Sequence, residues 1–175
     1  INLGTYEGGE STVQITFYAV VAEEIEPNLT VRYEVNNLTD GSGWKDEVDA
    51  DNSDTLKFYI EVHNTAIPST AENLSVWANF PTGPAGSFTS EAFADADNAS
   101  QASDYVVVNL AENANLTLVS NSTRVTWDSN GDGIYEYEQR LWPQDVFGEL
   151  GISNFGDLYG CNPFILTLTF EAVVN

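Results

Sequence analysis

Apolar and polar residues alternate along most of the chain, with β-branched and aromatic side chains at every second position. A period of two places one set of side chains on a single face of a strand, so it predicts half-buried β-strands. The pattern is clearest in four segments, whose apolar positions are Val13-Ile15-Phe17, Val31-Tyr33-Val35, Leu56-Phe58-Ile60-Val62 and Leu74-Val76-Ala78-Phe80.

Further short segments carry the same signal, and clusters of Gly, Asn, Asp and Pro such as residues 81–84 separate them. Many short strands at this spacing predict an all-β fold, a β-sandwich. Residues 143–150 are the only stretch that we expect to form a helical turn. The additional strands are expected at residues 105–110, 116–119, 123–127, 134–139 and 164–174.

The two ends of the chain carry similar sequences. Residues 3–8 (LGTYEG) and 15–21 (ITFYAVV) recur as residues 155–160 (FGDLYG) and 168–174 (LTFEAVV). Alternating strands can resemble each other by chance, but both copies also place a Gly-x-x-x-Gly segment before the strand. We therefore interpret the match as an internal repeat.

If residues 168–174 form the last strand of the domain, the first copy is a last strand with no domain before it. An exposed apolar strand has to be covered. We therefore predict an N-terminal arm, residues 1–22, and a sandwich domain, residues 23–175. The arm would donate its strand to an identical subunit, and such head-to-tail contacts generate fibres. Alternatively, residues 1–22 are the end of a preceding repeat in a longer array. The side chains expected to enter the neighbour are Val13, Ile15, Phe17, Ala19 and Val21.

Six short motifs stand out between residues 31 and 174: 44–48 (WKDEV), 54–58 (DTLKF), 62–64 (VHN), 71–76 (AENLSV), 121–124 (NSTR) and 155–158 (FGDL). Over this range the chain resembles the Ig-like repeats of prokaryotic cell-surface proteins. The resemblance implies an immunoglobulin-like β-sandwich, here with an N-terminal extension strand, and a non-catalytic spacer, adhesive or polymeric role. The N-terminal arm resembles those of donor-strand pili and archaeal threads.

The charge of the chain restricts its partners. The formal net charge is −22, from 27 acidic and 5 basic side chains. Nucleic acids and anionic membranes would be repelled, so neither is expected as a partner. No apolar run is long enough to span a membrane, and we predict no membrane insertion. The acidic surface fits a secreted protein, a cation-binding surface or a protein adapted to high salt.

Residues 128–136 (DSNGDGIYE) have the layout of a calcium loop, with oxygen ligands at alternating positions and glycines at the turn. The expected ligands are the side chains of Asp128, Asn130, Asp132 and Glu136 and the carbonyl of Ile134, which makes Ca²⁺ a candidate cofactor. Gln139 stands where an EF-hand would have its bidentate glutamate, so a weaker site is expected. A polar hairpin turn is the alternative, because Asn-Gly and Asp-Gly favour turns. The acidic residues 46–54 lack this spacing and are interpreted as a solvated loop.

Six sequons of the form N-x-Ser/Thr suggest N-linked glycans on an extracellular, cell-surface protein. The chain contains no methionine and starts at Ile1, which we interpret as a mature product without its leader. Ordinary turns rich in Asn and Ser are the alternative explanation of the sequons. Their asparagines are Asn28, Asn37, Asn73, Asn98, Asn115 and Asn121.

Few other residues suggest chemistry. The chain has one histidine, His63, and one cysteine, Cys161, which exclude an intrachain disulfide and a Cys/His metal cluster. No nucleophile elbow, phosphate loop or zinc motif is present, so we predict that the protein is not an enzyme. The tryptophans are expected in the core or along an edge, with a carbohydrate-binding platform as the functional alternative. These are Trp44, Trp77, Trp127 and Trp142.

Overall fold

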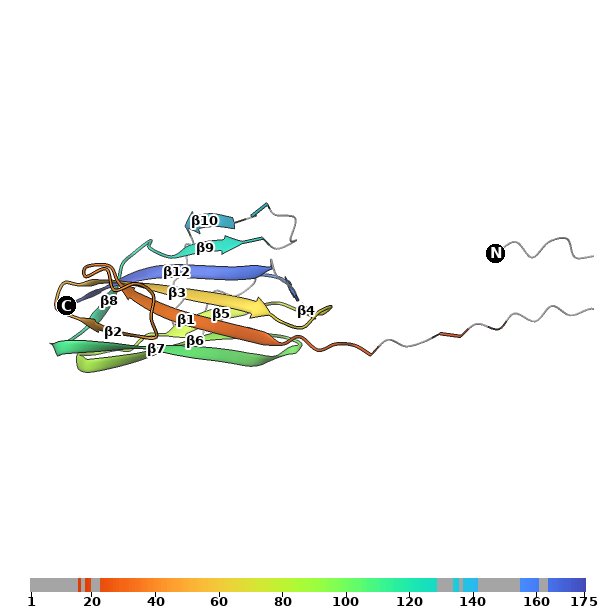
Figure 1. The fold of residues 1–175 in the computed structure, drawn as a ribbon, viewed down its shortest axis with the longest axis horizontal. Coiled ribbons are helices and arrows are strands. Elements are labelled where there is room, and N and C mark those ends of the chain that lie inside the picture. Colours follow the sequence, from red (N-terminus) through yellow and green to blue (C-terminus); the bar gives the residue numbers. More distant parts are fainter. Residues whose placement is uncertain are drawn as a thin grey trace, which may run out of the picture.

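The protein is described by a computed structural model, which covers residues 16, 18–19, 23–128, 134–135, 137–141, 155–160 and 164–175. The described residues contain twelve strands and no helix, so the all-β prediction is confirmed. Two large sheets form a sandwich-like body, and residues 23–28 lead away from it at the start of β1 (Figure 1). The helical turn expected at residues 143–150 lies outside the described residues.

The larger sheet has six strands in the order β1-β3-β12-β9-β10, with β8 also paired to β12. All its pairings are antiparallel, and β3 pairs over its whole length with β1 on one side and β12 on the other. A register shift between Tyr137 and Arg140 adds a bulge to β10. The strands are β1 (Leu29–Asn37), β3 (Thr55–Asn64), β8 (Leu116–Leu118), β9 (Arg124–Trp127), β10 (Tyr137–Leu141) and β12 (Ile165–Val174).

The second sheet has four strands in the order β2-β7-β6-β5, and a small third sheet pairs β11 with β4. The long β6–β7 hairpin is antiparallel, whereas β2 runs parallel to β7. The acidic residues 46–54, interpreted as a loop, thus contain a strand. The strands are β2 (Glu47–Ala50), β4 (Thr70–Ala71), β5 (Ser75–Asn79), β6 (Ala85–Ala96), β7 (Ala99–Ala114) and β11 (Leu158–Tyr159).

One apolar core fills the space between the two large sheets. At its centre Phe58 of β3 stacks on Phe170 of β12, with ring centroids 4.9 Å apart, and Phe80 meets Phe58 edge to face at 5.8 Å. Tyr33 of β1 is fully buried, and its hydroxyl lies 2.9 Å from the Ser90 hydroxyl of β6. This polar contact joins the two sheets through the core, and burial raises the pKa of Tyr33 well above its ordinary value.

The outer edge of β1 is protected from further strand pairing. The Tyr33 N–H donates to a carboxylate oxygen of Asp104 in β7 at 2.8 Å. Two residues further on, Val35 and Lys45 exchange backbone hydrogen bonds of 2.8 and 3.0 Å. Edge strands that offer free backbone groups invite association, so these contacts block one edge of the six-stranded sheet.

Candidate functional site

The strand that the sequence repeat singles out, β12, lies in the middle of the six-stranded sheet. It pairs with β3 from Ile165 to Val173, and on its other side with β9 and then β8. Its inward side chains are almost completely buried, at 0 % exposure for four of them and 1 % for Val174. These inward residues are Leu166, Leu168, Phe170, Ala172 and Val174.

The repeat aligns the arm with β12 residue by residue. The five expected donor positions fall on the five buried positions of β12, and Thr16, Tyr18 and Val20 fall on its outward ones. Of the donor positions only Ala19 is described, and it is exposed, while the neighbouring Tyr18 is 92 % exposed. Within its own chain, Ala19 thus lacks the cover that its counterpart Ala172 has. Val13, Ile15, Phe17 and Val21 lie outside the described residues.

Two glycines before β12 have specific structural roles. Gly156 has a φ of +81°, a conformation that side chains disfavour. At Gly160 an added Cβ would collide with the carbonyl oxygen of Ala66, while the Gly160 N–H donates to Ser69 O at 2.8 Å. Between them, β11 pairs with β4. Gly4 and Gly8 in the arm have the same spacing, so the arm repeats both the strand and the residues that dock its approach.

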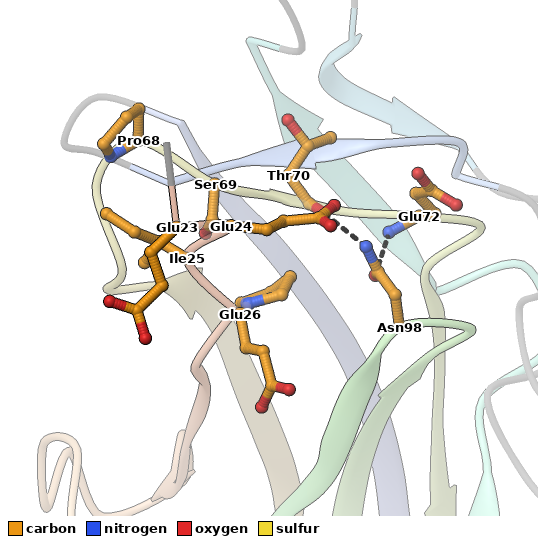
Figure 2. A pocket seen from close by; sticks show the side chains of 10 residues that line it. Glu23, Glu24, Ile25, Glu26, Pro68, Ser69, Thr70, Glu72 and Asn98 are labelled. Carbon is orange, nitrogen blue, oxygen red and sulfur yellow. Dashed lines mark hydrogen bonds between the residues drawn. The ribbon is translucent and has the colours of Figure 1, made fainter. Parts of the chain in front are cut away.

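Residues 23–27, which follow the arm, line an acidic depression at the end of the sandwich (Figure 2). Glu23, Glu24, Glu26 and Glu72 all line it, beside the end of the β6–β7 hairpin. Asn98 of that hairpin joins it to β4, since its amide donates to Thr70 O and accepts from the Glu72 N–H, both at 2.9 Å. Four carboxylates thus line this depression.

The structure describes two of the five expected calcium ligands. Asp128 is 2 % exposed at the end of β9, and Ile134 is 71 % exposed. Asn130, Asp132 and Glu136 lie outside the described residues. Within the described ranges, no group of three or more His, Cys, Asp or Glu side chains is arranged to hold a metal ion.

The sequons differ in their environments. Asn37 is 1 % exposed, and its amide nitrogen donates to Asp49 O at 3.1 Å and to Asp54 Oδ2 at 2.7 Å, so a glycan there would disrupt a buried network. The amides of three exposed asparagines also donate to neighbours, at 2.6 to 2.9 Å. These three are Asn28, Asn73 and Asn98. The side-chain amides of Asn115 and Asn121 make no hydrogen bond to the described residues.

The tryptophan side chains mostly have their faces covered. Trp127 is buried, between Tyr137 at 6.0 Å and Phe155 at 5.7 Å. Trp77 stacks on Phe93 at 5.2 Å, and Trp44, 41 % exposed, packs on Tyr59 at 5.5 Å. A platform for sugars needs an open aromatic face, and among the described tryptophans Trp44 is the exposed one. Trp142 lies outside the described residues.

His63 and Cys161 add little to the chemistry. His63 is half-buried on the outer side of β3, and its Nε2 has no hydrogen-bond partner in the part of the chain that the structure describes. Cys161 lies outside that part.

Comparisons with known proteins identify no relative. No family model, curated protein or solved structure matches the chain. A search of the described residues finds no helix of the length and apolarity that crossing a membrane requires.

Proposed function

We propose that the protein is a structural, non-catalytic subunit of an extracellular filament, assembled head to tail by β-strand donation. Residues 23–175 would form an Ig-like sandwich that accepts a strand, and residues 1–22 would be the donor arm. The proposal rests on one observation: the two copies of the repeated strand sequence lie in different environments. The copy in β12 has a fully buried inward face, whereas Ala19 of the other copy is exposed within its own chain.

A neighbouring copy is the natural place for the arm. In every copy, β12 fills the position that this sequence occupies in the sandwich and is paired on both sides, so the arm would have to add to a different edge of the accepting sandwich. Donor and acceptor are different surfaces, so each contact leaves a free donor at one end and a free acceptor at the other, which generates a fibre.

The glycine pair supports docking of the arm as a unit. Selection for apolar alternation alone would not require Gly4 and Gly8 at the spacing of Gly156 and Gly160. In the C-terminal copy these positions permit a positive φ and a close backbone approach.

Adjacent arm residues provide a test with an internal control. Phe17 corresponds to the buried Phe170, whereas Tyr18 corresponds to Glu171 on the outward side of β12. Phe17→Glu should abolish filaments seen by negative-stain electron microscopy, because a carboxylate would enter an apolar site. Tyr18→Glu should leave them intact, because it reproduces the residue that β12 already has.

Deletion of residues 1–22 should also abolish filaments, with circular dichroism checking that the sandwich still folds. Monodisperse particles of the unmodified chain would contradict strand donation. They would instead favour the alternative that this domain is a repeat module of a larger S-layer or adhesin protein, because residues 3–21 equally resemble the end of a preceding repeat. A carbohydrate-binding adhesin has less support, since Trp77 and Trp127 each stack on another aromatic ring and only Trp44 of the described tryptophans is exposed.

We also propose Ca²⁺ binding at residues 128–136 and N-linked glycans on the exposed sequons. Calorimetry at millimolar Ca²⁺ should detect binding, and chelation should lower the melting temperature. Absence of both effects would exclude the site. Mass spectrometry of native material should find Asn37 unmodified, because its amide is buried and doubly hydrogen-bonded.

A further inference from the structure

The few basic residues of this acidic protein are concentrated on one side. All five lie in or beside the six-stranded sheet: four are in its strands, and the fifth exchanges backbone hydrogen bonds with β1. They are Arg32 in β1, Lys57 in β3, Arg124 in β9, Arg140 in β10 and Lys45 next to Val35.

Three of these cations belong to the outer face of that sheet, which we define as the outward side chains of β1, β3, β12 and β9. The face carries three carboxylates as well, so its charge is balanced. Arg32 lies 2.7 Å from Glu34 and 3.9 Å from Glu61, and Lys57 lies 3.6 Å from Glu171. Arg124 is next to Thr169 of β12 in the sheet register. At the edge of the sheet, β10 adds one acidic residue, Glu138, and one basic residue, Arg140.

The outer face of the four-stranded sheet is different. Its outward charged residues are all acidic: Glu47 and Asp49 in β2, and Glu91 and Asp95 in β6. Asn109 of β7 donates to Glu47 at 2.7 Å, but the described strands of this sheet contain no Lys or Arg. Lys45 lines a depression with Glu47 and Asp49, so among the described residues it is the one cation near this face, and the charge of the face stays acidic.

This difference decides how two copies can approach. Each copy has a net charge of −22. Because salt screens charges beyond about 8–10 Å, the local charge at the contact governs the repulsion more than the total does. Two acidic faces repel each other, and an acidic face gains little from a balanced one. Two balanced faces avoid the repulsion, and their alternating signs offer opposite charges to each other.

The balanced face also has the shape and composition of a contact surface. Threonines occupy five of its positions: Thr30, Thr55, Thr126, Thr167 and Thr169. Small, β-branched side chains allow two sheets to stack at about 10 Å. At one corner Trp44 packs on Tyr59, and Arg32 lies 5.8 Å from the centroid of the Tyr59 ring.

We propose that the outer face of the six-stranded sheet is a lateral contact, where a second copy of this chain packs face to face through the same surface. A two-fold axis makes such a contact self-complementary and closed, so it forms pairs. Lateral pairing is thus separate from strand donation, which joins copies end to end. Together the two contacts would place filaments side by side.

Full-length variants with equal charge changes test this proposal. Lys57→Glu makes the face more acidic by two charges. Thr89→Glu with Ser103→Glu adds the same two charges to the outer face of the four-stranded sheet, where both residues are exposed. In the Phe17→Glu background, sedimentation velocity should show a concentration-dependent dimer that Lys57→Glu abolishes and the double variant retains. A dimer that both retain or both lose equally, or no dimer at all, would overturn the proposal.

Electron microscopy separates failure of this proposal from failure of strand donation. Lys57→Glu alone should leave filaments but remove their side-by-side pairing. Filaments that stay paired would overturn the lateral contact only, whereas absence of filaments from the unmodified chain would overturn strand donation only. The sequon at Asn121 borders the face near Lys57 and Glu171. The glycan proposed for this sequon would therefore stand at the rim of the contact and not within it.

Discussion

The two large sheets differ in the size of the side chains that they bring to the core. The six-stranded sheet supplies mainly large residues, including Tyr33, Phe58 and Phe170, whereas β6 opposite supplies one large residue, Phe88, with Ser90 and three alanines. Large residues on one sheet and small ones on the other fill the space at native density. The core is therefore asymmetric, and each sheet should respond differently to a change in volume. The alanines are Ala92, Ala94 and Ala96.

The largest effect is expected from removing volume on the large side. Phe58→Ala should destabilise the protein by about 3–5 kcal/mol, because Phe58 is fully buried and contacts Phe170, Phe80 and Tyr33. Urea denaturation measures the change in the free energy of unfolding. Phe93→Ala, on the outer face of β6, is the control and should cost much less. Equal losses would mean that the core is not centred on the Phe58 stack.

A smaller effect is expected from adding volume on the small side. Ala92→Leu should destabilise the protein by about 1–3 kcal/mol, because Ala92 is completely buried. The large side chains of the core would have to shift to make room for the leucine. Thr89→Leu, an exposed position on the same strand, should be close to neutral. Stabilisation by Ala92→Leu in the same denaturation assay would reveal unfilled space and contradict the tight fit.

This asymmetry also explains which strands the sequence predicts. Strands of the six-stranded sheet alternate Val, Ile, Leu and Phe with polar residues, and β1, β3 and β12 match their predicted ranges to within two residues. The sequence signal fails for β6, although it is a long strand between two neighbours. Its inward positions are mostly Ala and Ser, which carry little hydrophobic contrast, and its most apolar outward residue is Phe93.

The candidate site was only partly predictable for a related reason. Alternation alone identifies which side chains of the arm share a face, because that property depends on neighbouring residues. Burial of Asn37 depends on Asp49 and Asp54, which only the fold brings to it, so its sequon looks like any other. The balanced outer face is similarly invisible in sequence, since Lys57 meets Glu171 across 114 positions through the β3–β12 pairing.

The polar contact between the two sheets should respond unequally to removal of either partner. Ser90 donates its hydroxyl to Asn79 O at 2.9 Å, so Tyr33 has to be the donor to Ser90. Ser90→Ala leaves the buried Tyr33 hydroxyl without an acceptor and should cost about 1–3 kcal/mol, whereas Tyr33→Phe should cost about 0.5–1.5 kcal/mol. A double-mutant cycle measured by denaturation tests the coupling. A larger loss for Tyr33→Phe would contradict this direction of donation.

The smallest effect concerns Asp54, at the turn that joins β2 to β3. The Asp51 N–H, and in addition the Asn37 amide, hold the pKa of Asp54 below its ordinary value of about 3.8. A carboxyl with a lowered folded pKa stabilises the protein fully above its unfolded value, and that stabilisation is lost as the pH falls through the folded pKa. Asp54→Asn should therefore be less stable than the unmodified protein near neutral pH, and the difference should shrink as the pH falls below about 3.8. Comparing the two proteins at each pH cancels the titration of the other carboxylates, which dominates the acid response of so acidic a chain. A difference that stays constant across this range would show that the Asp54 contacts stabilise the turn independently of its charge.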